Sequence, residues 1–209
     1  MRLRRKAEVA PEIVEEPATD EALQPQGPLD ADDLDLEDDP TFANHIDLGG
    51  LLVAPPPEGI DLRLQVDEET GDVLSVLLAG EDGALELRPF ASRRGGDLWA
   101  EIRPQIASET ARHGGTATER HGEFGTELVC LVPVTTPDGQ AATQPSRVIG
   151  YNGPRWFLRA TLLGLPAVEP EKAGVWEDLI RTTVVRRGSG AMPPGESLPL
   201  RLPPQAEQI

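Results

Sequence analysis

Apolar and polar residues alternate with a period of two along much of the chain after residue 50. The clearest run covers residues 60–66, where even-numbered side chains are apolar and odd-numbered ones are polar. Because successive side chains of a strand point to opposite faces, this spacing predicts a half-buried strand. Similar apolar or alternating runs predict further strands at residues 51–53, 73–78, 85–90, 116–121, 127–134, 141–151, 156–163 and 182–187.

Two stretches have the spacing of helices instead. Asp97 predicts the N-cap of the first helix, which ends at Gly114-Gly115 and contains Pro104 either as a kink or in its first turn. The apolar face of this helix is formed by Leu98, Trp99, Ile102, Ile106 and Thr110. The second helix opens at Pro170, and its apolar stripe is formed by Val175, Trp176, Leu179 and Ile180. Hairpin strands with two separated helices predict an α+β fold, a largely antiparallel β-sheet with both helices packed on one face.

A hairpin is predicted at Asn152-Gly153, which separates two apolar runs. In a two-residue type I′ turn, Tyr151 lies opposite Pro154, and Ile149 lies opposite Trp156. This register places Trp156 on the core face of the sheet.

The other face of the hairpin carries Arg155, Phe157 and Arg159, which form the first candidate binding site. An exposed Phe between two arginines is typical of a protein-contact surface, because aromatic and Arg side chains are enriched in interface hot spots. The alternative is that Phe157 packs beneath another element while the arginines pair with acidic neighbours. A second hypothesis is an anion site at Arg93 and Arg94, since they precede the N-terminus of the first predicted helix.

The chain of 209 residues has a formal net charge of −17, and this charge is unevenly distributed. Residues 1–40 hold 13 acidic residues, four basic residues and no aromatic residue. Such a segment cannot bury enough apolar surface to offset the entropy of ordering it, so we expect a disordered acidic N-terminal arm. The α+β domain is expected at residues 41–188, followed by an extended Pro-rich tail at 189–209. We also expect the arm to fold back over Arg155 and Arg159, in a contact that salt weakens.

The net charge limits which partners the protein can bind, and the cysteine content indicates its cellular compartment. The acidic balance argues against nucleic-acid binding, which needs a concentrated basic face. The single cysteine, Cys130, excludes an intramolecular disulfide and lies in an apolar run, so we expect an inert core residue of a cytoplasmic protein. The basic start of the chain lacks the apolar region of a signal peptide, and no run of apolar residues is long enough for a membrane span.

The sequence contains no motif for catalysis or metal binding. The three histidines, His45, His113 and His121, are too scattered for zinc, and the acidic residues 30–39 lack the glycine and distal Glu of an EF-hand loop. A nucleophile elbow, a phosphate-binding P-loop and a dinucleotide fingerprint are all missing. We therefore expect no cofactor and favour a non-catalytic role, while an enzyme stays open.

Several strings, in their order along the chain, resemble one known family. They are GPLDADDLDLEDD, IDLGGL, LRLQVDEETG, FGTELVCLVPV and PLRLPP, together with the stretch at residues 136–164. On these motifs the chain resembles the actinobacterial domain of unknown function 3710 family from about Gly27 to Pro204. The resemblance implies a cytosolic protein without an established activity, cofactor or catalytic residue, so no role transfers to Arg147, Trp156 or any other position. The layout is also similar to that of the Mog1/PsbP-like α+β domains, a likeness of fold alone.

Three functional hypotheses follow from these features. The first is a cytosolic interaction module with an unidentified protein partner, acting through contacts rather than chemistry. The alternative is a small anionic-ligand binder or enzyme with a pocket near Arg93 and Arg94, on which Arg147 or Arg93 would converge. The third is a nucleic-acid-associated protein, which requires a continuous basic stripe despite the net charge.

Overall fold

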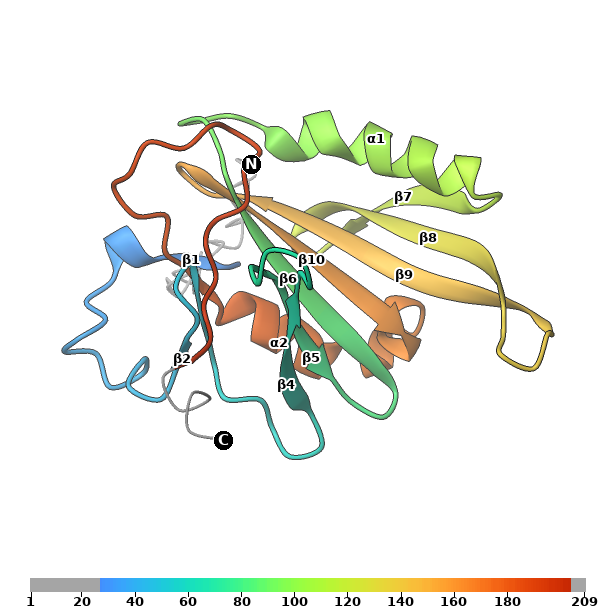
Figure 1. Cartoon of the computed structure of the whole chain (residues 1–209), viewed down its shortest axis with the longest axis horizontal. Helices are drawn as coiled ribbons and strands as arrows, with labels where there is room; N and C mark the ends of the chain where they lie inside the picture. The colour runs from blue at the N-terminus through green and yellow to red at the C-terminus, as the bar shows by residue number, and fades with distance from the viewer. Residues whose placement is uncertain (1–26, 204–209) are drawn as a thin grey trace, which may run out of the picture.

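The computed structural model describes residues 27–203, and Figure 1 shows how they are arranged. The main element is a seven-stranded antiparallel sheet with the strand order β4-β5-β6-β10-β9-β8-β7. Its strands are β4 (Asp61–Val66), β5 (Val73–Ala79), β6 (Gly83–Ala91), β7 (Thr116–Gly122), β8 (Gly125–Thr135), β9 (Ala141–Asn152) and β10 (Trp156–Gly164). The predicted α+β fold with a largely antiparallel sheet is confirmed.

A second, four-stranded sheet has the order β1-β11-β3-β2. Its strands are β1 (Leu29–Asp30), β2 (Ile46–Asp47), β3 (Leu51–Val53) and β11 (Val184–Val185). β1 runs parallel to β11, while the other two pairings are antiparallel. This small sheet therefore joins segments from the beginning and the end of the described chain.

The two helices lie on opposite faces of the main sheet (Figure 1). Trp99 of α1 (Leu98–Arg112) packs in one core cluster with Phe157, whereas Trp176 of α2 (Gly174–Arg181) packs in another with Trp156. Trp156 and Phe157 are neighbours on β10, so their side chains point to opposite faces. The prediction that both helices pack on one face is therefore wrong, because Trp156 and Phe157 point to opposite faces of β10 and each is buried by a different helix.

The first helix begins where the sequence predicts, whereas the second begins later than predicted. α1 begins after its predicted N-cap, Asp97, and runs through Pro104 without a break. α2 begins at Gly174 rather than at Pro170, because Pro170–Lys172 forms a separate 3-10 turn. Two further 3-10 turns lie at Ala31–Asp33 and Leu165–Ala167.

The β9–β10 hairpin has a longer connection than the predicted two-residue turn. Asn152 pairs with Phe157, and Asn152 lacks the positive φ that a type I′ turn requires. Pro154 has no N–H to donate to the ladder, so the strands separate before it. The register differs from the predicted one by four residues. Because four is an even number, each side chain keeps its predicted face, and Trp156 is buried as expected.

The N-terminal part of the described chain belongs to the fold. Leu29 and Leu34 pack in a small cluster with Phe42, and Asp30 accepts a hydrogen bond from the indole of Trp156 at 2.8 Å. The predicted boundary at residue 40 therefore lies inside the folded body. Residues 1–26 of the predicted arm lie outside the described residues.

The C-terminal segment runs as an extended strap along the end of β6. The Leu198 N–H donates to the Pro89 carbonyl at 3.0 Å, and the Ala91 N–H donates to the Glu196 carbonyl at 2.8 Å. Leu198 is fully buried. As far as residue 203, the predicted tail is attached to the folded body by these hydrogen bonds and by the buried Leu198.

Candidate functional site

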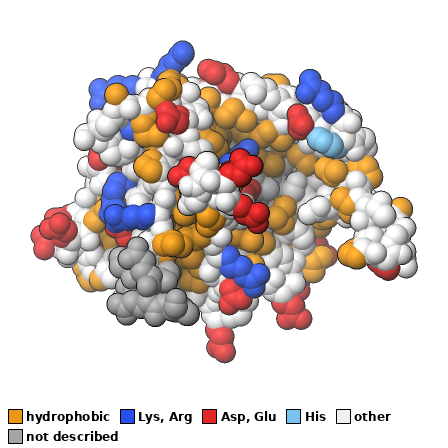
Figure 2. Space-filling model, viewed as in Figure 1, with side chains coloured by type: hydrophobic (Ala, Val, Ile, Leu, Met, Phe, Trp, Pro, Cys, Tyr) orange, Lys and Arg blue, Asp and Glu red, His pale blue; other side chains and the backbone are white. Residues whose placement is uncertain are grey.

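α1 packs over the half of its sheet face that β7, β8 and β9 form. On the same face, several side chains of β6 and β10 remain half-exposed. They are Glu86, Arg88, Phe90, Arg159 and Thr161. Figure 2 shows the molecule from the same side as Figure 1, with acidic and basic side chains interspersed among hydrophobic ones over the visible surface. This charged half of the face is therefore partly open to solvent.

Arg88 of β6 and Arg159 of β10 lie directly opposite each other in the sheet. The guanidinium carbon of each lies 5.9 Å from the centroid of the Phe90 ring. A guanidinium group within about 6 Å of an aromatic ring is attracted to its face, so Phe90 helps to hold both positive groups in place. We call Arg88, Arg159 and Phe90 the arginine site.

The two arginines form no direct ion pair among the described residues, although Glu86 is close enough to act on the charge of Arg159. Neither takes part in an ion pair within residues 27–203, and the Nε atom of each is buried without a hydrogen-bond acceptor. Burial lowers the pKa of Arg159, the charge of Arg88 lowers it further, and Glu86 opposes this shift. Like charges directly opposite each other destabilise a sheet, so a bound anion would relieve the repulsion.

An aromatic row connects the arginine site to the core beneath α1. The ring centroids of Phe90 and Phe157 are 6.0 Å apart, and those of Phe157 and Trp99 are 6.2 Å apart. Trp99 is fixed in turn, because its indole N–H donates to the Thr126 carbonyl at 2.6 Å. Its ring lies so close to Gly150 that no side chain fits there. The arginine site therefore rests on closely packed aromatic rings.

The structure separates the three residues of the first predicted site. Phe157 is fully buried beneath α1 and offers no exposed contact, so the alternative reading holds for this residue. Arg155 donates to Asp32 at 3.3 Å, which is a contact between the hairpin and the N-terminal segment. Arg159 is half-exposed and lies four residues further along the chain, within β10.

Sequence reasoning did not single out Arg88, although the alternation at residues 85–90 placed it on the polar side of its strand. The missing information is the strand order. β6 pairs with β10 although α1 and three strands lie between them in the chain. No local pattern reports such a pairing, so Arg88 could not be matched with Arg159.

The second predicted site, at Arg93 and Arg94, lies in the exposed turn before α1. The N–H groups that an anion would use at this helix N-terminus already have acceptors. The Ala100 N–H donates to Asp97 at 3.0 Å, and the preceding N–H donates to Asn152 at 3.3 Å. Two cap side chains thus occupy the place of the predicted anion.

A second charged cluster is buried between the main sheet and α2. Glu127 and Arg147 are 0% and 1% exposed, and the Nε atom of Arg147 lies 3.4 Å from the Glu127 carboxylate. Arg120 approaches the same carboxylate at 3.1 Å, and Arg147 also pairs with Glu177 of α2. Each charge in the cluster has a partner of opposite sign, so the cluster connects α2 to the sheet. Two of its buried atoms, Glu127 Oε1 and Arg147 Nε, have no hydrogen-bond partner among the described residues.

Residues 27–203 offer neither a metal site nor a membrane-spanning helix. This part of the chain holds no group of three or more His, Cys, Asp or Glu side chains placed to bind a metal ion. It also has no helix that is both long and apolar enough to cross a membrane. Cys130 is a free, buried thiol, as expected.

The fold is that of an α+β protein, and the part of its sheet that α1 leaves open carries charged side chains. More particularly, the chain belongs to the family described as "Protein of unknown function (DUF3710)", whose model matches residues 27–209. This confirms the family resemblance of the sequence motifs. No curated protein matches the chain. A crystal structure from Bacteroides thetaiotaomicron is similar with a TM-score of 0.41 and 13% sequence identity, over 71% of this chain and 50% of that chain. The chain thus spans half the length of that protein.

Proposed function

We propose that this protein is a cytosolic, non-catalytic binding module that holds an acidic segment of a protein partner at Arg88 and Arg159. The observation that carries the proposal is that Arg88 and Arg159 lie directly opposite each other in the sheet and form no ion pair among the described residues. An Arg side chain binds a carboxylate through two parallel hydrogen bonds. Two such groups side by side can take carboxylates from neighbouring positions of one peptide.

The surroundings of the arginine site favour a peptide over a small ligand. Phe90 offers an apolar ring and Thr161 a hydroxyl group, and both are half-exposed on the sheet. Small ligands are usually held in concave pockets that bury most of their surface. Glu86 repels further anions, so it limits where the acidic group can lie. The free and buried Cys130 supports the cytosolic location.

The competing hypothesis is that the protein binds a small anionic ligand, and the structure favours a different binding site for it than the one expected near Arg93 and Arg94. Arg147, which was expected to converge with Arg93 on one pocket, is buried against Glu127 and Glu177. A small anion such as phosphate would therefore also bind at the arginine site, because guanidinium groups recognise phosphate and carboxylate by the same geometry.

A titration followed by NMR tests the proposal with the full-length protein. The probe is a synthetic peptide with two glutamates among glycines, and inorganic phosphate is titrated in parallel. We expect the peptide to shift the Nε–H signals of Arg88 and Arg159 until they saturate. Arg159→Gln should weaken peptide binding about tenfold, since hydrogen bonds to charged groups contribute about 1.5–3 kcal/mol.

A matched control is Arg63→Gln, because Arg63 is an exposed arginine of the same sheet that already pairs with Asp61. This variant should keep the affinity for the peptide. Equal affinities of the wild type and Arg159→Gln would disprove the proposal. Saturation by phosphate alone would assign the site to a small anion instead.

A further inference from the structure

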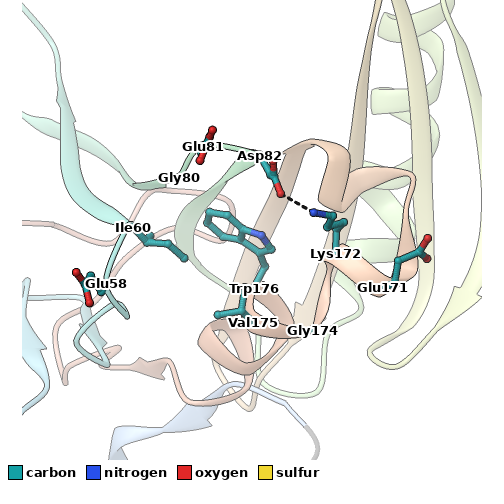
Figure 3. Close-up of a pocket in the computed structure, with 11 residues that line it drawn as sticks. Glu58, Ile60, Gly80, Glu81, Asp82, Glu171, Lys172, Gly174, Val175 and Trp176 are labelled. Carbon is teal, nitrogen blue, oxygen red and sulfur yellow. Dashed lines mark hydrogen bonds and ion pairs between the residues drawn. The ribbon is translucent and has the colours of Figure 1, made fainter.

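A pocket of about 460 Å³ lies at the N-terminal end of α2 (Figure 3). Three segments form it: residues 58–60 before β4, the turn Gly80 to Asp82 between β5 and β6, and residues 171–176. Trp176 stands at its centre, with Ile60 on one side and the Asp82–Lys172 ion pair on the other (Figure 3). The pocket thus combines an apolar wall with a polar one.

The indole N–H of Trp176 has no acceptor among the described residues, although the side chain is only 3% exposed. The other two tryptophans of the chain do have one, since Trp99 donates to Thr126 and Trp156 donates to Asp30. Figure 3 shows the nitrogen of Trp176 on the side of the ring that faces Asp82 and Lys172. The Trp176 nitrogen is not one of the fully buried atoms without a partner, so its N–H opens onto the pocket, where a ligand can supply the acceptor.

The rim of the pocket is strongly acidic. Its carboxylates are Glu58, Glu81, Asp82 and Glu171, and all four residues are exposed. Lys172 is the single base in the lining and donates to Asp82 at 2.8 Å. Three carboxylates therefore remain without a cation in the pocket. They do not converge as metal ligands, because residues 27–203 contain no such group.

We propose that this pocket binds a basic segment of a partner protein. An Arg or Lys side chain of that segment lies among Glu58, Glu81 and Glu171, and a main-chain carbonyl of the same segment accepts the Trp176 N–H. Charge complementarity selects the cation. The Trp176 N–H favours a ligand with a hydrogen-bond acceptor close to its cation. One Arg or Lys residue of a peptide supplies both groups, the cation in its side chain and the acceptor in its main-chain carbonyl. The site lies at α2 and is independent of the arginine site on the other face of the sheet.

The three indole N–H signals in the NMR spectrum of the full-length protein report directly on this pocket. Trp176→Phe identifies the signal of Trp176. The probe is a synthetic peptide with two arginines among glycines, and its control contains glutamine in place of arginine. We expect the arginine peptide to shift the Trp176 signal until it saturates, while the signals of Trp99 and Trp156 stay in place.

Two triple variants separate the pocket from general electrostatics. The pocket variant combines Glu58→Gln, Glu81→Gln and Glu171→Gln, and it should weaken binding of the arginine peptide at least tenfold, because three ion pairs of up to about 1 kcal/mol are lost. The control variant removes the same charge elsewhere through Glu68→Gln, Glu101→Gln and Asp138→Asn, and it should change the affinity less than threefold. All six side chains are exposed, so both variants are expected to fold.

Three outcomes would overturn the proposal. One is a Trp176 signal that the arginine peptide does not move, or that the glutamine peptide moves equally. Another is an equal loss of affinity in the two triple variants. The third concerns the chain's own basic residues, Arg2, Arg4, Arg5 and Lys6. If replacing these four residues by glutamine moves the Trp176 signal without any peptide, the pocket belongs to the chain itself and not to a partner.

Discussion

The side-chain amide of Asn152 donates a hydrogen bond to the carboxylate of Asp97 at 2.8 Å. The same Asn152 accepts the Trp99 N–H, and Asp97 accepts the Ala100 N–H, so the two side chains share the N-terminus of α1. A hairpin residue thus caps the helix that covers the neighbouring strands. This connection holds Trp99 in place. Trp99 is the first ring of the aromatic row that runs through Phe157 to the arginine site.

Replacing Asn152 by alanine should lower the free energy of unfolding by about 1 kcal/mol, because one helix N–H loses its acceptor and Asp97 loses a donor. Urea denaturation followed by circular dichroism measures this change. Asn44→Ala is the matched control, because Asn44 is exposed and should shift stability by less than about 0.5 kcal/mol. Equal stabilities of the two variants would contradict the capping role.

The predictions for Asp97 and Asn152 show that local features of the fold can be predicted from the sequence, whereas long-range contacts cannot. Asp97 was identified as a cap because an N-cap signal is local to the helix it starts. Asn152 was interpreted as a turn residue, since Asn-Gly is a strong hairpin signal, but its helix partner lies far away in the sequence. The faces of Trp156 and Phe157 were correct even though the register was not, because side-chain alternation survives an even shift.

Features that depend on strand order could not be predicted. Arg88 meets Arg159 only because β6 lies beside β10, and Glu127 meets Arg147 only because β8 lies beside β9 in one particular register. A buried arginine also contradicts the usual preference of charged residues for the surface. The pocket around Trp176 draws on three separate segments, so its acidic rim has no signature in any one of them.

Replacing Arg147 by methionine should lower the free energy of unfolding by about 3–5 kcal/mol, because the carboxylate of Glu127 stays buried with one of its two cations removed. Adding Glu127→Gln to this variant should recover part of the loss, since the uncompensated charge disappears. Chemical denaturation of both variants provides the measurement. Arg63→Met, which breaks an exposed ion pair, should cost less than about 1 kcal/mol. A loss of similar size in the two single variants would refute the structural role of the buried cluster.

The attachment of the extended C-terminal segment should depend on pH, because Arg201 of this segment binds the carboxylate of Asp47. Burial pushes the pKa of Asp47 upward, but hydrogen bonds from Arg186, the Gly49 N–H and Arg201 outweigh this effect and lower it below the ordinary value. A carboxyl group whose pKa is lower in the folded state stabilises the fold above its unfolded pKa, near pH 4, and loses this contribution as the pH falls through the folded value. Asp47→Asn should therefore be less stable than the wild type at pH 7, and the difference should shrink below pH 4.

Urea denaturation at pH 7 and at pH 3 measures the pH dependence of this difference. Asp61→Asn serves as the control, because Asp61 pairs only with the exposed Arg63. A difference between wild type and Asp47→Asn that is the same at both pH values would contradict the role of the Asp47 charge.

Replacing Arg88 by glutamine should stabilise the protein in the absence of a ligand. The two guanidinium groups of Arg88 and Arg159 repel each other across the sheet, and opposed like charges cost a few tenths of a kcal/mol to about 1 kcal/mol. The gain should decrease as salt is added, because ions screen the repulsion between partly exposed groups. Thermal denaturation at low and at high ionic strength measures both effects, with Arg63→Gln as the variant that should gain nothing. A lower stability of Arg88→Gln in low salt would mean that the arginines are held by an acidic group of the chain itself, and the arginine site would then not be free for a partner.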